Sequence, residues 1–137
     1  MDHPKKLALV GAGGISCHLL PILSHESDIV LIDGDKYEPH NSDRQFPALS
    51  HESHGVNKAE YLSGVQHKHT LKEITWLPYY MEGPSIVNHP EFEGVEMLVG
   101  AVDNNQSRKI ICDVADMLDV PAVLAGNETN VGDAHLF

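Results

Sequence analysis

The sequence LALVGAGGIS at positions 7–16 limits the possible folds more than any other stretch of this chain. An apolar run stops at Gly11, Gly13 and Gly14, and a helical pattern follows. This order is typical of the strand, tight turn and helix start of a nucleotide-binding βαβ unit. Glycines allow a sharp turn, and the helix start offers unpaired backbone N–H groups to a phosphate. Ser16 replaces the last glycine of the motif, and a plain strand-to-helix turn is the alternative interpretation.

The rest of the chain alternates between apolar runs and helical patterns. We expect strands at 6–10, 28–32, 71–76, 97–102 and 121–125, a last extended piece at 134–137, and helices at 14–24, 57–65 and 107–118. The first helix is expected to bury its apolar residues Ile15, Leu19, Ile22 and Leu23. Residues 36–54 form a long polar loop, and loops of that length are usually functional or mobile.

This alternation predicts an α/β fold. The expected form is a Rossmann-like, open, mainly parallel sheet with helices on both faces and the strand order 3-2-1-4-5. The length of 137 residues fits one domain spanning 1–137 with a single core. Ligands of such sheets bind outside the carboxyl ends of the strands, where the strand order reverses.

Charge and cysteine content narrow the class of protein. A formal net charge of −11 argues against binding to nucleic acid or to an anionic membrane, and no apolar run approaches the roughly 20 residues of a membrane helix. Cys17 and Cys112 both lie in helical patterns, which favours buried thiols over a disulfide and indicates a reducing, cytoplasmic compartment. The ten histidines are better interpreted as solvated loop residues than as metal ligands.

Three acidic residues follow predicted strands. Asp33 ends the second strand about twenty residues after the glycines, where an acid commonly accepts hydrogen bonds from ribose hydroxyls; the alternative is a turn residue before Gly34. Asp35 is either a second acid of the site or a solvated turn residue. Asp103 can hold magnesium, cap the following helix, or do both. Because strands one, two and four are expected to be neighbours, these residues should converge.

The loop and the helix after the second strand supply candidate phosphate ligands. Arg44 is one of only two arginines, and its planar guanidinium suits phosphate oxygens, to which Asn41 can also donate. Lys58 can place a point charge on a phosphate. The alternatives are a surface ion pair for Arg44 and an exposed helix lysine for Lys58. Arg108, the other arginine, can pin the loop after the fourth strand to neighbouring acids.

Five motifs in register resemble the ThiF/MoeB/ubiquitin-activating-enzyme superfamily of adenylating proteins. They are Gly11-Ala12-Gly13-Gly14, Asp33-Gly34-Asp35, Asn41-Ser42-Asp43-Arg44-Gln45, Gly55-Val56-Asn57-Lys58-Ala59 and Asp103-Asn104-Asn105-Gln106-Ser107-Arg108. Each motif alone is weak, but the five in this order are specific, and the likeness runs from about Leu7 to the end.

The resemblance implies an ATP-dependent adenylyltransferase with Mg²⁺. Asp33 would hold the ribose, the phosphates would be bound by Asn41, Arg44 and Lys58, and Asp103 would hold the metal. Family members activate a C-terminal carboxylate as an acyl-adenylate, usually the Gly-Gly tail of a small β-grasp protein, and work as homodimers or pseudo-symmetric heterodimers. The residues that the motifs place at the nucleotide are Gly11, Ala12, Gly13, Gly14, Asp33, Asp35, Asn41, Arg44, Gln45, Lys58, Asp103 and Asn104.

The sequence also departs from the family pattern. Neither Cys17 nor Cys112 matches the thioester position, and the zinc-binding C-x-x-C pairs of the family would lie beyond Phe137. The chain also starts too close to its first strand to supply the arginine that family dimers exchange. We therefore expect a minimal or truncated adenylation core. Two alternatives are an NAD-dependent oxidoreductase, which the glycines and Asp33 permit, and a non-catalytic partner subunit.

Overall fold

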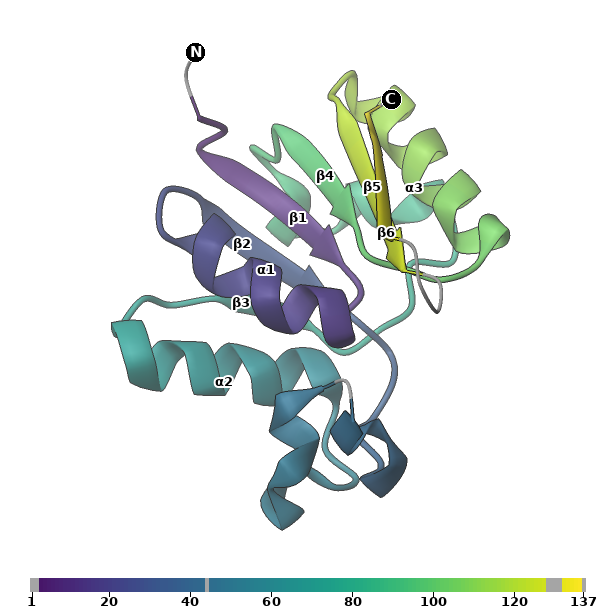
Figure 1. Cartoon of the computed structure of the whole chain (residues 1–137). Helices are drawn as coiled ribbons and strands as arrows, with labels where there is room; N and C mark the ends of the chain where they lie inside the picture. Colours follow the sequence, from purple (N-terminus) through teal and green to yellow (C-terminus); the bar gives the residue numbers. More distant parts are fainter. Residues whose placement is uncertain (1–2, 44, 128–131, 137) are drawn as a thin grey trace.

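A computed structural model describes residues 3–43, 45–127 and 132–136 (Figure 1). The six strands form one sheet in the order β3-β2-β1-β4-β5-β6. Strands β1 (Lys6–Val10), β2 (Asp28–Ile32), β3 (Thr75–Leu77), β4 (Met97–Gly100) and β5 (Ala122–Asn127) are parallel, and β6 (Gly132–Leu136) runs antiparallel beside β5. The predicted strand order is confirmed, and β6 extends it at one edge.

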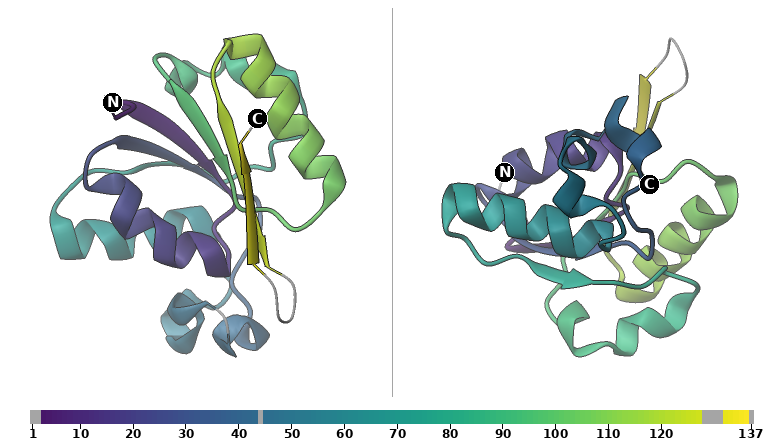
Figure 2. Two further views of the ribbon diagram at one scale, coloured as in Figure 1. Left: turned by 45° about the horizontal axis from the view of Figure 1, so that its top comes forward. Right: turned by 90° about the horizontal axis from the view of Figure 1, so that it is seen from below.

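Helices cover both faces of the sheet, as Figure 2 shows. Helices α1 (Gly14–Ser24) and α2 (Lys58–Thr70) pack on one face against a buried cluster that includes Leu7, Leu9 and Leu31. Helix α3 (Asn105–Leu118) packs on the other face against Ala8, Val10 and Leu98. Successive residues of β1 thus enter opposite cores, which explains why the strand is almost wholly apolar.

Segment bounds differ from the prediction mainly around α2. The helix continues to Thr70, and Leu71 ends it in the left-handed conformation with φ of 60°. Strand β3 therefore starts later than predicted and is only three residues long. The described residues of the polar loop form the short 3-10 helices η1 (Pro39–Asp43), η2 (Phe46–Leu49) and η3 (His51–Ser53). The 3-10 helices η4 (Pro84–Asn88) and η5 (Pro90–Phe92) follow β3.

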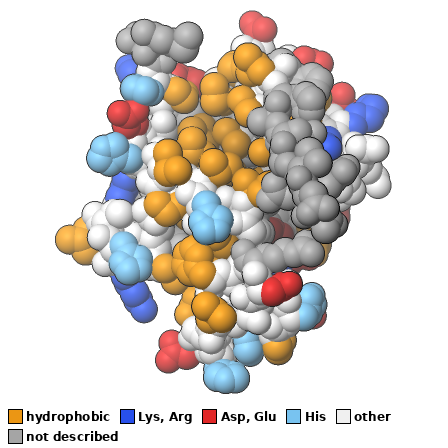
Figure 3. Space-filling view, in the orientation of Figure 1, with side chains coloured by type: hydrophobic (Ala, Val, Ile, Leu, Met, Phe, Trp, Pro, Cys, Tyr) orange, Lys and Arg blue, Asp and Glu red, His pale blue; other side chains and the backbone are white. Residues whose placement is uncertain are grey.

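The expected buried face of α1 is confirmed only in part. Leu19 and Leu23 pack against the core cluster, but Ile22 is 70% exposed, and Cys17 and Leu20 are buried together with two serines of the helix. The small side chains face the sheet because α1 starts at the glycine turn, which brings its first residues close to β1. Figure 3 shows apolar side chains gathered on the face of the molecule where α1 lies. Burial of Cys17 confirms its interpretation as a packing residue.

The register of the three central strands brings their carboxyl ends together. Val10 pairs with Ile32 of β2 and with Gly100 of β4. The residues that follow these strands therefore lie at one edge of the sheet, where the 3-10 helices of the polar loop also gather (Figure 1). Among the described residues, no helix is long and apolar enough to cross a membrane.

Leu71 provides a test of the α2 boundary. A β-carbon in the left-handed region is unfavourable, and this side chain is 80% exposed, so little burial is lost on removing it. We expect Leu71→Gly to raise the free energy of unfolding by about 0.5–1 kcal/mol. The measurement is the urea midpoint at an unchanged slope. Leu71→Ala keeps the β-carbon and should give no such gain; equal gains for both variants would contradict the assigned backbone conformation.

Candidate functional site

A cavity of about 510 Å³ opens at the carboxyl ends of β1, β2 and β4. Its walls come from the glycine turn, the β2 end, the start of α2, the segment after β3 and the start of α3. The predicted residues that line it are Gly11, Gly13, Gly14, Asp33, Asp35, Gln45, Lys58, Asp103 and Asn104. Ala12 and Asn41 do not line it, and Arg44 lies outside the described residues.

The glycine turn is fixed by close backbone contacts. Gly11 has φ of +98°, and its N–H donates to the Ile32 carbonyl at 2.8 Å. A β-carbon at this position would lie 2.6 Å from the Ala101 carbonyl oxygen, so no larger residue fits. Ser16, which departs from the glycine motif, donates its hydroxyl to the Gly11 carbonyl. The serine therefore holds the turn from the helix side.

Asp33 joins the glycine turn to the end of β2. One carboxylate oxygen accepts the Ala12 N–H at 2.7 Å, and the other accepts the Asp35 N–H at 2.8 Å. Burial raises the pKa of Asp33, while these two hydrogen bonds and the charge of Lys58 act in the opposite direction. Each carboxylate oxygen has a second acceptor position, so the group can also accept from a ligand hydroxyl.

Asn57 belongs to the motif at 55–59, but the sequence did not predict its role in holding the segment after β2. Its amide donates to the main-chain carbonyls of Asp33 and Asp35 at 2.7 and 3.2 Å, and its side-chain oxygen accepts the Glu60 N–H. It caps α2 and ties the helix start to the β2 end. An asparagine directly before a helical pattern is a preferred N-cap, and that signal could have identified it.

Lys58 presents a buried cation to the cavity. Its side chain is 8% exposed, and within the described ranges it makes no ion pair. The exposed-helix alternative for this lysine is therefore wrong. Its ammonium lies 5.7 Å from the ring centroid of Tyr37, within the range of a cation–π contact.

Asp103 lines the cavity from the segment between β4 and α3. Asn104, not Asp103, caps α3, because its side-chain oxygen accepts the Ser107 N–H at 2.8 Å. Asp103 is exposed and has no hydrogen-bond or ion-pair partner in the described part of the chain, which leaves its carboxylate available. Arg108 pins the loop, as one alternative expected, through a bond from Nε to the Val102 carbonyl rather than to an acid.

Asn41 and Gln45 both lie in the polar loop, but only Gln45 lines the cavity. The Asn41 side-chain oxygen accepts the Glu38 N–H at 2.9 Å within its own turn, and a contact to phosphate stays a prediction. Gln45 lines the cavity, and its Oε1 atom is buried without a hydrogen-bond partner among the described residues. An unsatisfied buried oxygen of this kind is costly, so this atom is available to a donor on a ligand.

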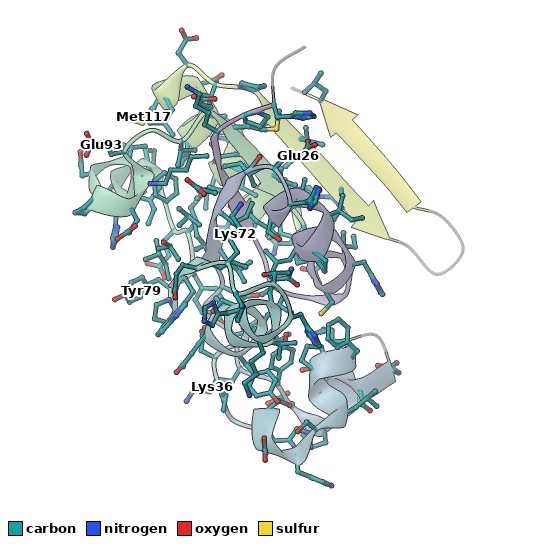
Figure 4. The ribbon with its side chains drawn as sticks, turned by 90° about the vertical axis from the view of Figure 1, so that its left-hand side faces the viewer. Glu26, Lys36, Lys72, Tyr79, Glu93 and Met117 are labelled. Atoms are coloured by element: carbon teal, nitrogen blue, oxygen red, sulfur yellow. The ribbon has the colours of Figure 1, made fainter. Side chains whose placement is uncertain are left out.

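Tyrosines close the cavity beside Asp35. The Tyr80 hydroxyl donates to a carboxylate oxygen of Asp35, which raises the pKa of Tyr80 to about 12, and its ring packs on Gly34. Tyr79, labelled in Figure 4, lies at the surface next to it and also lines the cavity. No sequence motif marks these tyrosines, because they follow a short strand in a segment without periodic pattern.

Two glycines of the turn allow a matched test. Gly11→Ala places a methyl group against the Ala101 carbonyl and strains a positive φ, so we expect a loss of about 2 kcal/mol or more in stability. Gly13→Ala meets only Gln45 Nε2 at 3.8 Å, and its melting temperature should stay near that of the unmodified chain. Thermal melting of both variants measures this difference, and equal destabilisation would contradict the described turn.

The raised pKa of Asp33 predicts a pH dependence. A native-state pKa above the unfolded value means that the folded chain binds this proton more tightly, so the contribution of Asp33 to stability falls as the pH rises through the native-state pKa. A ¹³C NMR titration of the carboxyl should give a midpoint above the ordinary value of about 3.9. A midpoint at or below that value would show that the hydrogen bonds outweigh burial.

This chain is similar in sequence to proteins of known families. The ThiF family model matches residues 3–137. The "Adenylyltransferase and sulfurtransferase uba4" of Emericella nidulans is 30% identical over 126 residues, covering 88% of this chain and 25% of that protein. The "Ubiquitin-activating enzyme E1-like" protein of Saccharomyces cerevisiae is 28% identical over 132 residues, covering 91% of this chain and 21% of its own length.

Solved structures support the fold. The E. coli tRNA N6-threonylcarbamoyladenosine dehydratase TcdA superposes with a TM-score of 0.73 at 21% identity, covering 88% of this chain and 50% of the other. A structure of the same protein in complex with AMP gives the same values. The chain thus spans about a quarter of the first curated relative and half of the structural relative. The family match over residues 3–137 shows that this chain belongs to the ThiF family.

Proposed function

We propose that this chain is the nucleotide-binding part of an ATP-dependent adenylyltransferase that activates a carboxylate as an acyl-adenylate. The observation that carries the proposal is the convergence of the glycine turn, Asp33, Lys58 and Asp103 on one cavity. Adenylyltransferases among the relatives and the AMP complex of a structural relative support a nucleotide as the ligand.

The polar groups that line the cavity match the ribose and the phosphates of ATP. The carboxylate of Asp33 has acceptor positions for ribose hydroxyls. The backbone N–H groups at the α1 start carry partial positive charge and face the cavity with Lys58, which suits phosphate oxygens. Arg44 is assigned to the phosphates on its motif alone. In a chain of net charge −11, these local donors offset the repulsion that a polyanion would otherwise meet.

Asp103 fits a magnesium ion that is shared with phosphates. Mg²⁺ prefers one or two carboxylates together with phosphate oxygens and water, and the Asp103 carboxylate has no partner in the described segments. No group of three or more metal-binding side chains occurs among the described residues. A bound Mg²⁺ would supply charge neutralisation at the phosphates.

The reaction needs positioning and charge stabilisation rather than a side-chain nucleophile. A carboxylate oxygen attacks the α-phosphorus, the bond from this phosphorus to the bridging oxygen breaks, and pyrophosphate leaves. Lys58 would stabilise the charge that develops on the phosphate oxygens. We further propose that the carboxylate is the Gly-Gly tail of a small β-grasp protein and that the working form is a dimer.

Thermal unfolding with different nucleotides tests the proposal. A ligand that binds only the native state raises its stability by about 2.7 kcal/mol at a hundredfold excess over Kd. ATP with Mg²⁺ should therefore raise the melting temperature, and NAD should not. A shift with NAD alone would favour an oxidoreductase. Binding of ATP without pyrophosphate exchange in the presence of a Gly-Gly carrier protein would favour a non-catalytic subunit.

Lys58 and Lys68 form a matched pair on α2. Lys68 is exposed and lies outside the cavity, whereas Lys58 is buried in its wall. We expect Lys58→Met to weaken ATP binding at least tenfold, because hydrogen bonds to charged groups contribute about 1.5–3 kcal/mol. Lys68→Met should leave the affinity unchanged. Isothermal titration measures both, and equal affinities of the two variants would remove Lys58 from the site.

A further inference from the structure

Tyr37 lies beneath the phosphate-facing part of the cavity and has no role in the family motifs. Its side chain is fully buried, at 0% exposure. Its main chain is fixed on both sides, because its N–H donates to the Val56 carbonyl at 3.0 Å and its carbonyl accepts the Gly55 N–H at 2.9 Å. The ring is therefore held by the segment before α2, whether or not a ligand is present.

The Tyr37 side chain contacts both phosphate-facing parts of the site. Its hydroxyl donates to the Ala12 carbonyl of the glycine turn at 3.5 Å. Its ring faces the Lys58 ammonium, with Nζ 5.7 Å from the ring centroid. Tyr61 packs edge-on against the same ring at a centroid distance of 6.0 Å, which supports it from α2.

Burial of an ammonium group costs free energy unless another group stabilises its charge, and the type of this group decides how much charge is left for a ligand. A carboxylate within ion-pair distance would satisfy Lys58 but would also consume the charge that a phosphate needs. An aromatic face attracts a cation through its quadrupole and leaves the net positive charge in place. Tyr37 thus compensates for part of the burial of Lys58 without neutralising it.

We propose that Tyr37 is a positioning residue, whose ring holds the Lys58 ammonium toward the phosphates while its hydroxyl holds the glycine turn. The proposal rests on the function proposed above and names a residue that acts through Lys58. Because Lys58 acts on phosphate charge, the effect of Tyr37 should be larger for ATP than for AMP, which carries one phosphate.

A double-mutant cycle tests the coupling. We expect Tyr37→Leu to weaken ATP binding about tenfold and AMP binding less than threefold, and Tyr37→Phe, which keeps the ring, to stay within threefold for ATP. In a Lys58→Met background, Tyr37→Leu should change the ATP affinity less than threefold, which is the share left to its hydroxyl. Phe92→Leu removes a buried ring from the opposite core and should leave both affinities unchanged.

A series of fluorinated phenylalanines at position 37 tests the same role of the ring if the Tyr37→Leu variant does not fold. Phenylalanine and its di- and tetrafluoro analogues at position 37 keep the size of the ring but weaken the negative potential of its face. ATP affinity should then fall stepwise with fluorination while AMP affinity stays nearly constant. Equal losses for both nucleotides, or a full tenfold loss that persists without Lys58, would overturn the role of Tyr37. Failure of the unmodified chain to bind ATP would instead overturn the proposed function.

Discussion

The Asp33 carboxylate is the interaction on which the arrangement of this site depends. Its two oxygens hold the Ala12 N–H of the glycine turn and the Asp35 N–H after β2, and Asn57 adds hydrogen bonds to the main chain of the same segment. The half-buried Asp33 side chain thereby joins the segments after β1 and β2, and Asn57 ties the start of α2 to the second of them. Burial disfavours the ionised form of Asp33, and the surrounding donors compensate for part of that cost.

The parallel sheet makes this convergence possible. Since β1 is paired in register with both β2 and β4, the residues after these strands meet at one edge without long connections. The sheet is buried on both faces, so its strands are rigid, and the polar loops at their ends can carry function. Lys58 is the first residue of helix α2, so the Asn57 cap that fixes the start of this helix also positions Lys58 at the cavity.

The cavity brings charges of both signs together. Asp33, Asp35 and Asp103 line it, and the buried cation of Lys58 and the backbone N–H groups of a helix start add positive charge. Lys58 is compensated in part by the face of the Tyr37 ring and in part by the nearby charge of Asp33, and it forms no ion pair in the described part of the chain. Its charge therefore remains available to an anionic ligand, which is the property that a phosphate site requires.

The sequence by itself determined the fold class, the strand order and the edge of the sheet that carries the site, because apolar runs without polar positions fit only a sheet buried on both faces. It also predicted Asp33, Asp35 and Asp103 at the cavity, since all three come soon after central strands. Only the tertiary structure decided that Asn104 rather than Asp103 caps α3, that Cys17 rather than Ile22 enters the core, and that Tyr37 supports Lys58. The contact of Tyr37 with the glycine turn, like the hydrogen bonds made by Asp33 and Asn57, joins partners 21 to 25 positions apart in the chain, whose approach is set by packing and not by any local pattern.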